Sequence, residues 1–146
     1  MQILVVTYKL DFPTIRLGDA SITSNATSSA STSSPSAITG LSDTCTLTET
    51  HKVRAILSAK SLYNTSSSTY NVLMICNGTV SAANQIGVSN NSLANANAES
   101  VAIVICEVTL DAGTYTFNGG MSRNSGTMTL SATTTQPAIL TVDVVG

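Results

Sequence analysis

The sequence predicts an all-β fold, an antiparallel β-sandwich formed as a single domain. No long stretch keeps the 3.6-residue period of an amphipathic helix, and the apolar segments are short and rich in Val, Ile, Thr and Tyr. From Ala37 onward, turn residues and candidate strands alternate at about the 8–12 residue spacing that is typical of a sandwich. At 146 residues the chain is long enough for one domain with a full core and too short for two ordinary domains.

The chain before Ala37 divides into an extended N-terminal arm and a polar linker. The arm, residues 1–20, contains a strand candidate at Ile3 to Tyr8 and then a broken apolar pattern. Residues 21–36 are almost all small and polar, so burial cannot offset their ordering entropy and we predict a linker or a long surface loop. Several apolar side chains of the arm have no place in a sandwich formed by residues 37–146, and we expect them to dock onto a neighbouring protein: Val5, Val6, Tyr8, Phe12, Ile15 and Leu17.

Within residues 37–146, alternation of apolar and polar side chains predicts half-buried strands. The polar segment 64–69 is predicted to be a hairpin connection, and 80–100 to be a loop or a weak strand around Ile86 to Val88. Turns are expected at 111–113 and 118–120. The predicted strands are 44–50, 53–63, 114–117, 127–132 and a terminal strand at 139–145.

Two further segments, Tyr70 to Cys76 and Val101 to Cys106, are apolar on both faces. A strand in a small antiparallel sandwich normally has one face in water, so something must cover the second face. A segment of the same chain is one explanation, but no amphipathic helix is available to provide it. Subunit contacts are therefore favoured, because obligate interfaces resemble a core cut in half. The predicted interface residues are Val72, Met74, Val101, Ile103 and Ile105.

The composition excludes several classes of partner. Six scattered Lys and Arg residues and a net charge of −2 provide no cluster of cations for nucleic-acid phosphates. No apolar run approaches the roughly 18 residues that a membrane helix needs, which predicts a soluble protein with no membrane partner. The N-terminus lacks a basic region, and Lys9 and Asp11 interrupt its apolar stretch, so we expect no secretory signal and folding in a cytoplasm if Met1 is the native start.

No motif indicates catalysis. The chain has a lone His51 and no nucleophile elbow, phosphate-binding loop or metal-ligand spacing, so we expect no enzymatic activity, no cofactor and no metal. Cys45, Cys76 and Cys106 are widely spaced and odd in number, which predicts buried, reduced thiols, with a disulfide between two of them as the alternative. N-glycosylation patterns occur at four asparagines, as chance predicts in so polar a chain: Asn25, Asn64, Asn77 and Asn90.

Residues 37–146 resemble the tumour-necrosis-factor-like jelly-roll heads found in phage and virus decoration, fibre and spike proteins. The resemblance covers about three-quarters of the chain through short motifs. They are Ile38-Thr39-Gly40-Leu41 at the entry to the domain, the Thr-rich 44–50 leading to the strand 52–59, the hairpin Glu107 to Phe117, and the terminal strand 138–145.

This resemblance implies a homotrimer in which apolar strand faces meet near the threefold axis. It also implies a virion structural protein, specifically a capsid decoration (cement) protein that sits on the outer capsid surface and stabilises it. The partners would be further copies of the chain and the major capsid protein, with the arm docked on the capsid. Two alternatives are a receptor-binding head of a viral fibre, spike or turret, and a subunit of a cell-surface filament whose residues 3–8 complete a neighbour's sheet.

Overall fold

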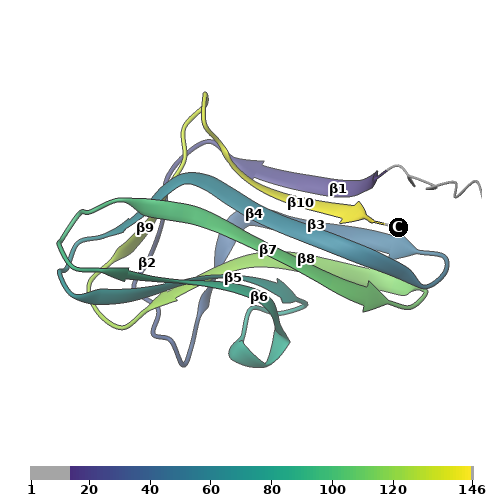
Figure 1. The fold of residues 1–146 in the computed structure, drawn as a ribbon, viewed down its shortest axis with the longest axis horizontal. Helices are drawn as coiled ribbons and strands as arrows, with labels where there is room; N and C mark the ends of the chain where they lie inside the picture. The colour runs from purple at the N-terminus through teal and green to yellow at the C-terminus, as the bar shows by residue number, and fades with distance from the viewer. Residues whose placement is uncertain (1–13, 146) are drawn as a thin grey trace, which may run out of the picture.

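The computed structural model describes residues 14–145 as a sandwich of two antiparallel sheets (Figure 1). Nearly all regular structure in this range is β, and the helical segment η1 (Ala82–Asn84) is a single 3-10 turn. In the same range no helix has the length and apolar character needed to cross a membrane. The predicted all-β sandwich is therefore confirmed.

The strand order of the two sheets shows why most connections cross between layers. The first sheet has the order β1-β10-β4-β9-β2, with β7 on the other edge of β4, and the second has the order β3-β8-β5-β6. The first sheet comprises β1 (Ile15–Ile22), β2 (Ala26–Ser28), β4 (His51–Asn64), β7 (Ser100–Leu110), β9 (Met128–Ser131) and β10 (Ala138–Val144). The second comprises β3 (Ser36–Leu47), β5 (Thr69–Asn77), β6 (Gln85–Leu93) and β8 (Gly113–Arg123).

The core lies between the inner faces of the two sheets. Val53, Ala55 and Leu57 project inward from β4 and are almost completely buried. On β8, Phe117 and Met121 are buried from the opposite side, and each such side chain contributes about 1.5–3 kcal/mol through burial. Gly119 lies between those two residues, and a Cβ there would approach both Leu41 Cβ and Leu57 Cδ2 to 3.3 Å, so a glycine lets the sheets pack closely.

The sandwich includes two strands, β1 and β2, from the residues that were predicted to form the arm and the linker. β1 pairs with β10 from Ile15 opposite Val144 to Ile22 opposite Ala138, and β2 pairs with β9. Ile15 and Leu17 therefore belong to a sheet strand, and Leu17 packs against the core. These segments are ordered mainly by backbone pairing at sheet edges, which composition does not report. Val5, Val6, Tyr8 and Phe12 lie outside the described residues.

Candidate interaction surface

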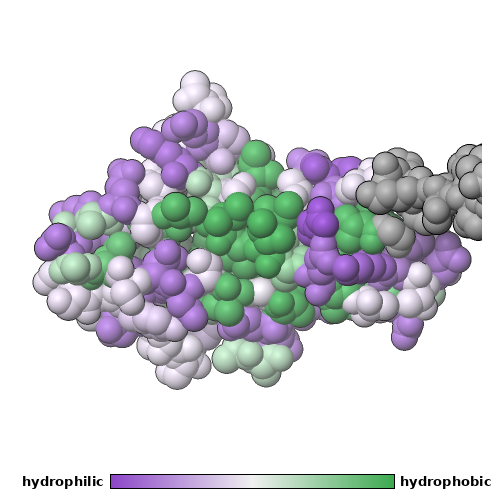
Figure 2. Space-filling model, viewed as in Figure 1, coloured by the Kyte–Doolittle hydropathy of each residue, from purple (hydrophilic) through white to green (hydrophobic). Residues whose placement is uncertain are grey.

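The outer face of the first sheet carries an exposed group of aliphatic side chains. On β7, Val101, Ile103 and Ile105 are 72%, 41% and 58% exposed, while the residues between them point into the core. Neighbouring strands extend the group, because Ile56 of β4 is opposite Ile105, and Ile139 of β10 shares Ser58 as a cross-strand neighbour with Ile103. We call these five residues the aliphatic patch: Ile56, Val101, Ile103, Ile105 and Ile139. Figure 2 shows a hydrophobic area near the middle of this face, over β10, β4 and β7.

A row of ion pairs crosses the same sheet and borders the aliphatic patch. Arg16 of β1 donates from Nε to Asp143 Oδ1 of β10, and Asp143 in turn lies opposite Arg54 of β4. Arg54 donates from Nε and Nη2 to Glu107 Oε1 of β7, at 2.9 and 2.6 Å. Lys52 forms a further ion pair with Glu107. The apolar surface is therefore delimited at one end by paired charges.

Paired cations lower the pKa of the Glu107 carboxyl. The hydrogen bond from Lys52 is the largest cause, followed by the hydrogen bond from Arg54. Because both bonds favour the ionised form of Glu107, the folded protein holds this carboxylate ionised to a lower pH than the unfolded chain does.

This shift predicts a pH dependence of stability. The contribution of Glu107 to the free energy of unfolding is fully present above its ordinary pKa of 4.5. It is lost as the pH falls through the lowered pKa of Glu107 in the folded protein. We expect Glu107→Gln to flatten the loss of unfolding free energy below pH 4.5, measured by urea denaturation at a series of pH values. Glu99→Gln is the control, because Glu99 forms no ion pair with any residue of the described range. Equal acid slopes for wild type and Glu107→Gln would contradict the prediction.

The second face of β5 is largely covered by the chain itself. Val72 and Met74 are only 7% and 2% exposed, and Val80 packs against them. Val80 occupies space over Gly120, where a Cβ would lie 2.6 Å from Val80 Cγ1. Asn118 Nδ2 donates to the Gly78 carbonyl at 2.8 Å and so fixes the covering loop. The structure thus gives Val72 and Met74 an intrachain partner where the sequence analysis placed a subunit contact.

The second apolar face of β7, unlike that of β5, is exposed. Val101, Ile103 and Ile105 have no such cover among the described residues, so the interface prediction continues to apply to these three. The sequence pattern did not distinguish the two strands. The apolar residue that packs on β5 is Val80, which stands in a loop rich in Asn, Ala and Ser. Nothing in the local sequence marks Val80 as the covering residue.

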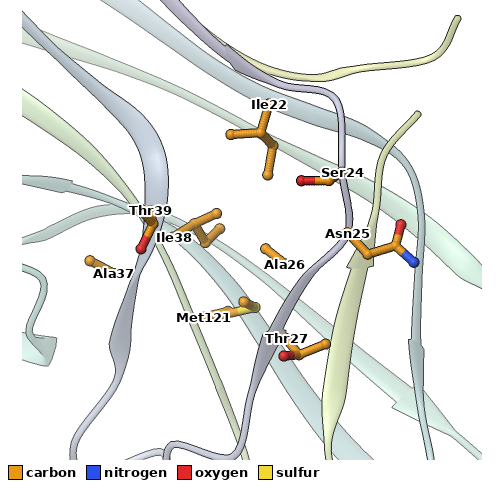
Figure 3. A pocket seen from close by; sticks show the side chains of 9 residues that line it. All are labelled: Ile22, Ser24, Asn25, Ala26, Thr27, Ala37, Ile38, Thr39 and Met121. Atoms are coloured by element: carbon orange, nitrogen blue, oxygen red, sulfur yellow. The ribbon is translucent and has the colours of Figure 1, made fainter. Parts of the chain in front are cut away.

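A hollow of about 280 Å³ lies where the chain passes from β1 to β2. Figure 3 shows Ile22, Ile38 and Met121 turned toward a common space, whereas the Asn25 amide points away from it. Asn25 Oδ1 instead accepts a hydrogen bond from the Ala132 amide at 3.0 Å. No titratable side chain lines the hollow, so it presents no general acid or base.

Outside the row of ion pairs, the titratable side chains in the described range are scattered. His51 lies at the start of β4 with Nε2 3.5 Å from Glu49 Oε1, and Asp111 accepts a hydrogen bond from Thr50 at 2.9 Å. Within residues 14–145, no group of three or more His, Cys, Asp or Glu side chains is arranged to hold a metal ion. These residues have structural neighbours and form no common site.

The cysteines are buried, as predicted. Cys45, Cys76 and Cys106 are each free of disulfide bonds, and Cys76 Sγ lies 3.5 Å from the Ser81 carbonyl oxygen. Burial raises the pKa of all three thiols, and the charge of Asp43 adds to the rise at Cys45. A raised thiol pKa reduces the thiolate fraction at neutral pH, so these are unreactive core side chains.

The four glycosylation patterns differ in accessibility. Asn64 is 0% exposed, and its amide is held by other protein groups, so it is not available to a glycan in the folded state. Asn25 and Asn90 are exposed, and Asn77 is half-buried.

Comparison with known proteins identifies the fold. Neither a protein family nor a curated protein sequence matches the chain. Among solved structures, the Eiger TNF of S. frugiperda shares 11% identity over 92% of this chain and 94% of its own, with a TM-score of 0.52. A CocE/NonD family hydrolase from Staphylococcus aureus shares 10% identity over 90% of this chain and 36% of its own, with a TM-score of 0.41. The infectious bursal disease virus Gx strain structure shares 8% identity over 98% of this chain and 46% of its own, with a TM-score of 0.38.

At these identities the similarity concerns the fold alone, and the Eiger match carries it. Together with the strand order, it shows that this chain is a tumour-necrosis-factor-like jelly roll, as the sequence motifs predicted.

Proposed function

We propose that this protein is a virion structural protein that decorates a capsid, forming homotrimers on the outer capsid surface and stabilising it. The observation that carries the proposal is the aliphatic patch, which exposes apolar side chains on the outer face of a sheet whose inner face already fills the core. Contiguous exposed apolar surface marks protein interaction sites. The threefold order and the viral context come from the resemblance to jelly-roll heads of virus surfaces.

The two outer faces of the sandwich suit different environments. The aliphatic patch offers burial worth about 25 cal/mol per Å² of apolar surface, with the ion-pair row at its rim, where charges cost least. On the second sheet, Thr44 pairs with Thr116 at 2.9 Å and Thr46 with Thr114 at 3.0 Å, all between hydroxyl oxygens. Such a face of mutually bonded hydroxyls suits contact with water. The first sheet would therefore turn toward partner subunits and the second toward solvent.

Attachment to the capsid is assigned to the N-terminal side of the first sheet. β1 is an edge strand, and edge strands offer backbone groups for pairing with another chain. Ile15, at the start of β1, is 58% exposed, and the apolar residues predicted to dock precede it in the chain. Binding only to the assembled lattice stabilises it by RT ln(1 + [L]/Kd), so the protein needs no enzymatic activity to act.

The test is the solution mass followed by capsid binding. Light scattering should give three times 15.0 kDa. Capsids stripped of surface proteins should then bind the trimer in cosedimentation and gain thermal stability. A version lacking residues 1–13 keeps β1 intact, and it should remain trimeric while losing capsid binding.

Three outcomes would contradict this proposal. A stable monomer would exclude the trimer. A trimer that neither cosediments with capsids nor stabilises them would exclude decoration and favour a receptor-binding head. A ladder of large species would favour a strand-exchanging filament.

A further inference from the structure

A second, smaller feature lies on the outer face of the other sheet. It is a depression of about 260 Å³ whose floor is formed by Val72 and Met74 of β5. Thr32, in the connection between β2 and β3, and Ala82 of η1 also line it. The remaining lining residues are Tyr70, Gln85, Val88, Asn90 and Ser122.

The depression contains a buried polar group without a partner. Ser122 is 1% exposed, and its Oγ forms no hydrogen bond with any atom of the described residues. Leaving a buried hydroxyl unsatisfied costs about 1–3 kcal/mol. Cross-strand pairing places Ser122 of β8 beside Val72 of β5, and Val72 beside Asn90 of β6. An unpaired hydroxyl and an exposed amide therefore flank one apolar floor residue.

The lining has the chemistry of a site for an uncharged, hydroxyl-rich ring. No charged side chain contributes to it, which disfavours phosphates and carboxylates. Gln85 and Asn90 each supply an amide donor and acceptor, and within residues 14–145 neither side chain is hydrogen-bonded. Tyr70 is 38% exposed and adds an aromatic side chain to the apolar floor. A sugar ring needs both elements, apolar surface for its C–H face and amide or hydroxyl partners for its hydroxyl groups.

We propose that this depression binds a neutral saccharide, with Ser122 Oγ and the Asn90 amide bonded to sugar hydroxyls and Tyr70 against the ring. The inference goes beyond the proposed function and does not depend on it. The depression lies on the second sheet and the aliphatic patch on the first, so trimer formation through the patch leaves the depression open. On a particle, such a site would add attachment to glycans to the decorating role.

The experiment titrates the isotope-labelled full-length protein with methyl glycosides of glucose, galactose, mannose and N-acetylglucosamine, and with a methyl sialoside as the charged comparison. Amide chemical shifts report binding residue by residue. We expect at least one neutral glycoside to bind with a Kd on the order of 1 mM and to shift the amides of Tyr70, Val72, Asn90 and Ser122. No shift with any glycoside, shifts confined to other regions, or a preference for the sialoside would overturn the proposal.

Single substitutions distinguish specific binding in the depression from nonspecific contact with the glycoside. Tyr70→Ala and Asn90→Ala should each weaken binding of the same glycoside by about tenfold, the equivalent of one lost contact. Asn95→Ala, in the exposed loop after β6, is the matched control and should bind like wild type. Ser122→Ala should weaken binding without lowering the midpoint of urea unfolding, because Oγ has no partner to lose. Unchanged affinity in Asn90→Ala and Ser122→Ala would overturn the assignment.

Discussion

Ile105→Asp is expected to convert the proposed trimer into a monomer of 15.0 kDa while leaving the jelly roll folded. Ile105 is 58% exposed in the single chain, so the fold gains little from its side chain. In the proposed trimer the same position would be buried, and an unpaired buried carboxylate costs several kcal/mol for each copy. The measurements are light scattering for the mass and circular dichroism for the β content.

Thr46→Asp provides the comparison for this variant. It introduces the same charge on the exposed outer face of the second sheet, and we expect it to remain trimeric. An Ile105→Asp protein that keeps the trimer mass would show that the aliphatic patch is not the interface. If both variants became monomeric, loss of the trimer would reflect net charge and not the position of the substitution.

Asn64→Ala is expected to lower the free energy of unfolding by about 2–4 kcal/mol. Asn64 is 0% exposed at the end of β4, and its Nδ2 donates to Asn71 Oδ1 at 2.7 Å and to the Ser125 carbonyl at 3.0 Å. Its Oδ1 accepts from the Ser66 amide at 2.9 Å. The alanine variant leaves these groups unsatisfied, including Asn71, which is itself 0% exposed. Urea denaturation measures the loss as a shift in midpoint at constant m-value.

Asn95→Ala again serves as the control, because Asn95 is exposed and no side-chain hydrogen bond of the described range involves it. Its unfolding free energy should stay within about 0.5 kcal/mol of wild type. A loss below 1 kcal/mol in Asn64→Ala would mean that water replaces the three bonds and that this end of the sandwich is more open than the structure shows.

Strand identity was predictable where packing follows the local pattern. In β4, Val53, Ala55 and Leu57 were predicted to share one face, opposite Arg54 and Ser58, and all three are buried in the structure. The turn at 111–113 separates β7 from β8 as expected, and Tyr115 Oη donates to the Asp111 carbonyl across it at 3.0 Å. The segment around Ile86 to Val88 is a full strand, β6, because pairing with β5 stabilises residues whose own propensity is weak.

Features that depend on the register of strand pairing could not be predicted from local sequence patterns. The saccharide site joins Tyr70, Asn90 and Ser122 through the pairing of β5 with β6 and β8. Thr32 reaches the same site from the connection between β2 and β3, where its neighbour Ser31 forms an isolated bridge with Arg123 of β8. Three of the five residues of the aliphatic patch, Val101, Ile103 and Ile105, were predicted as interface residues from the apolar pattern of their own strand. Ile56 and Ile139 join them only through the cross-strand order of the first sheet.

The position of β10 between β1 and β4 bears on how the chain acquires its structure. β1 has β10 as its strand partner among the described residues, and their pairing joins Ile15 to Val144. During synthesis on a ribosome, β1 therefore has no strand partner until β10 is made, after nearly all of the sandwich. Such long-range pairing is slow to form, and an unpaired edge strand is open to other chains meanwhile. The same interval leaves the backbone groups of β1 open to pairing with a strand of another chain.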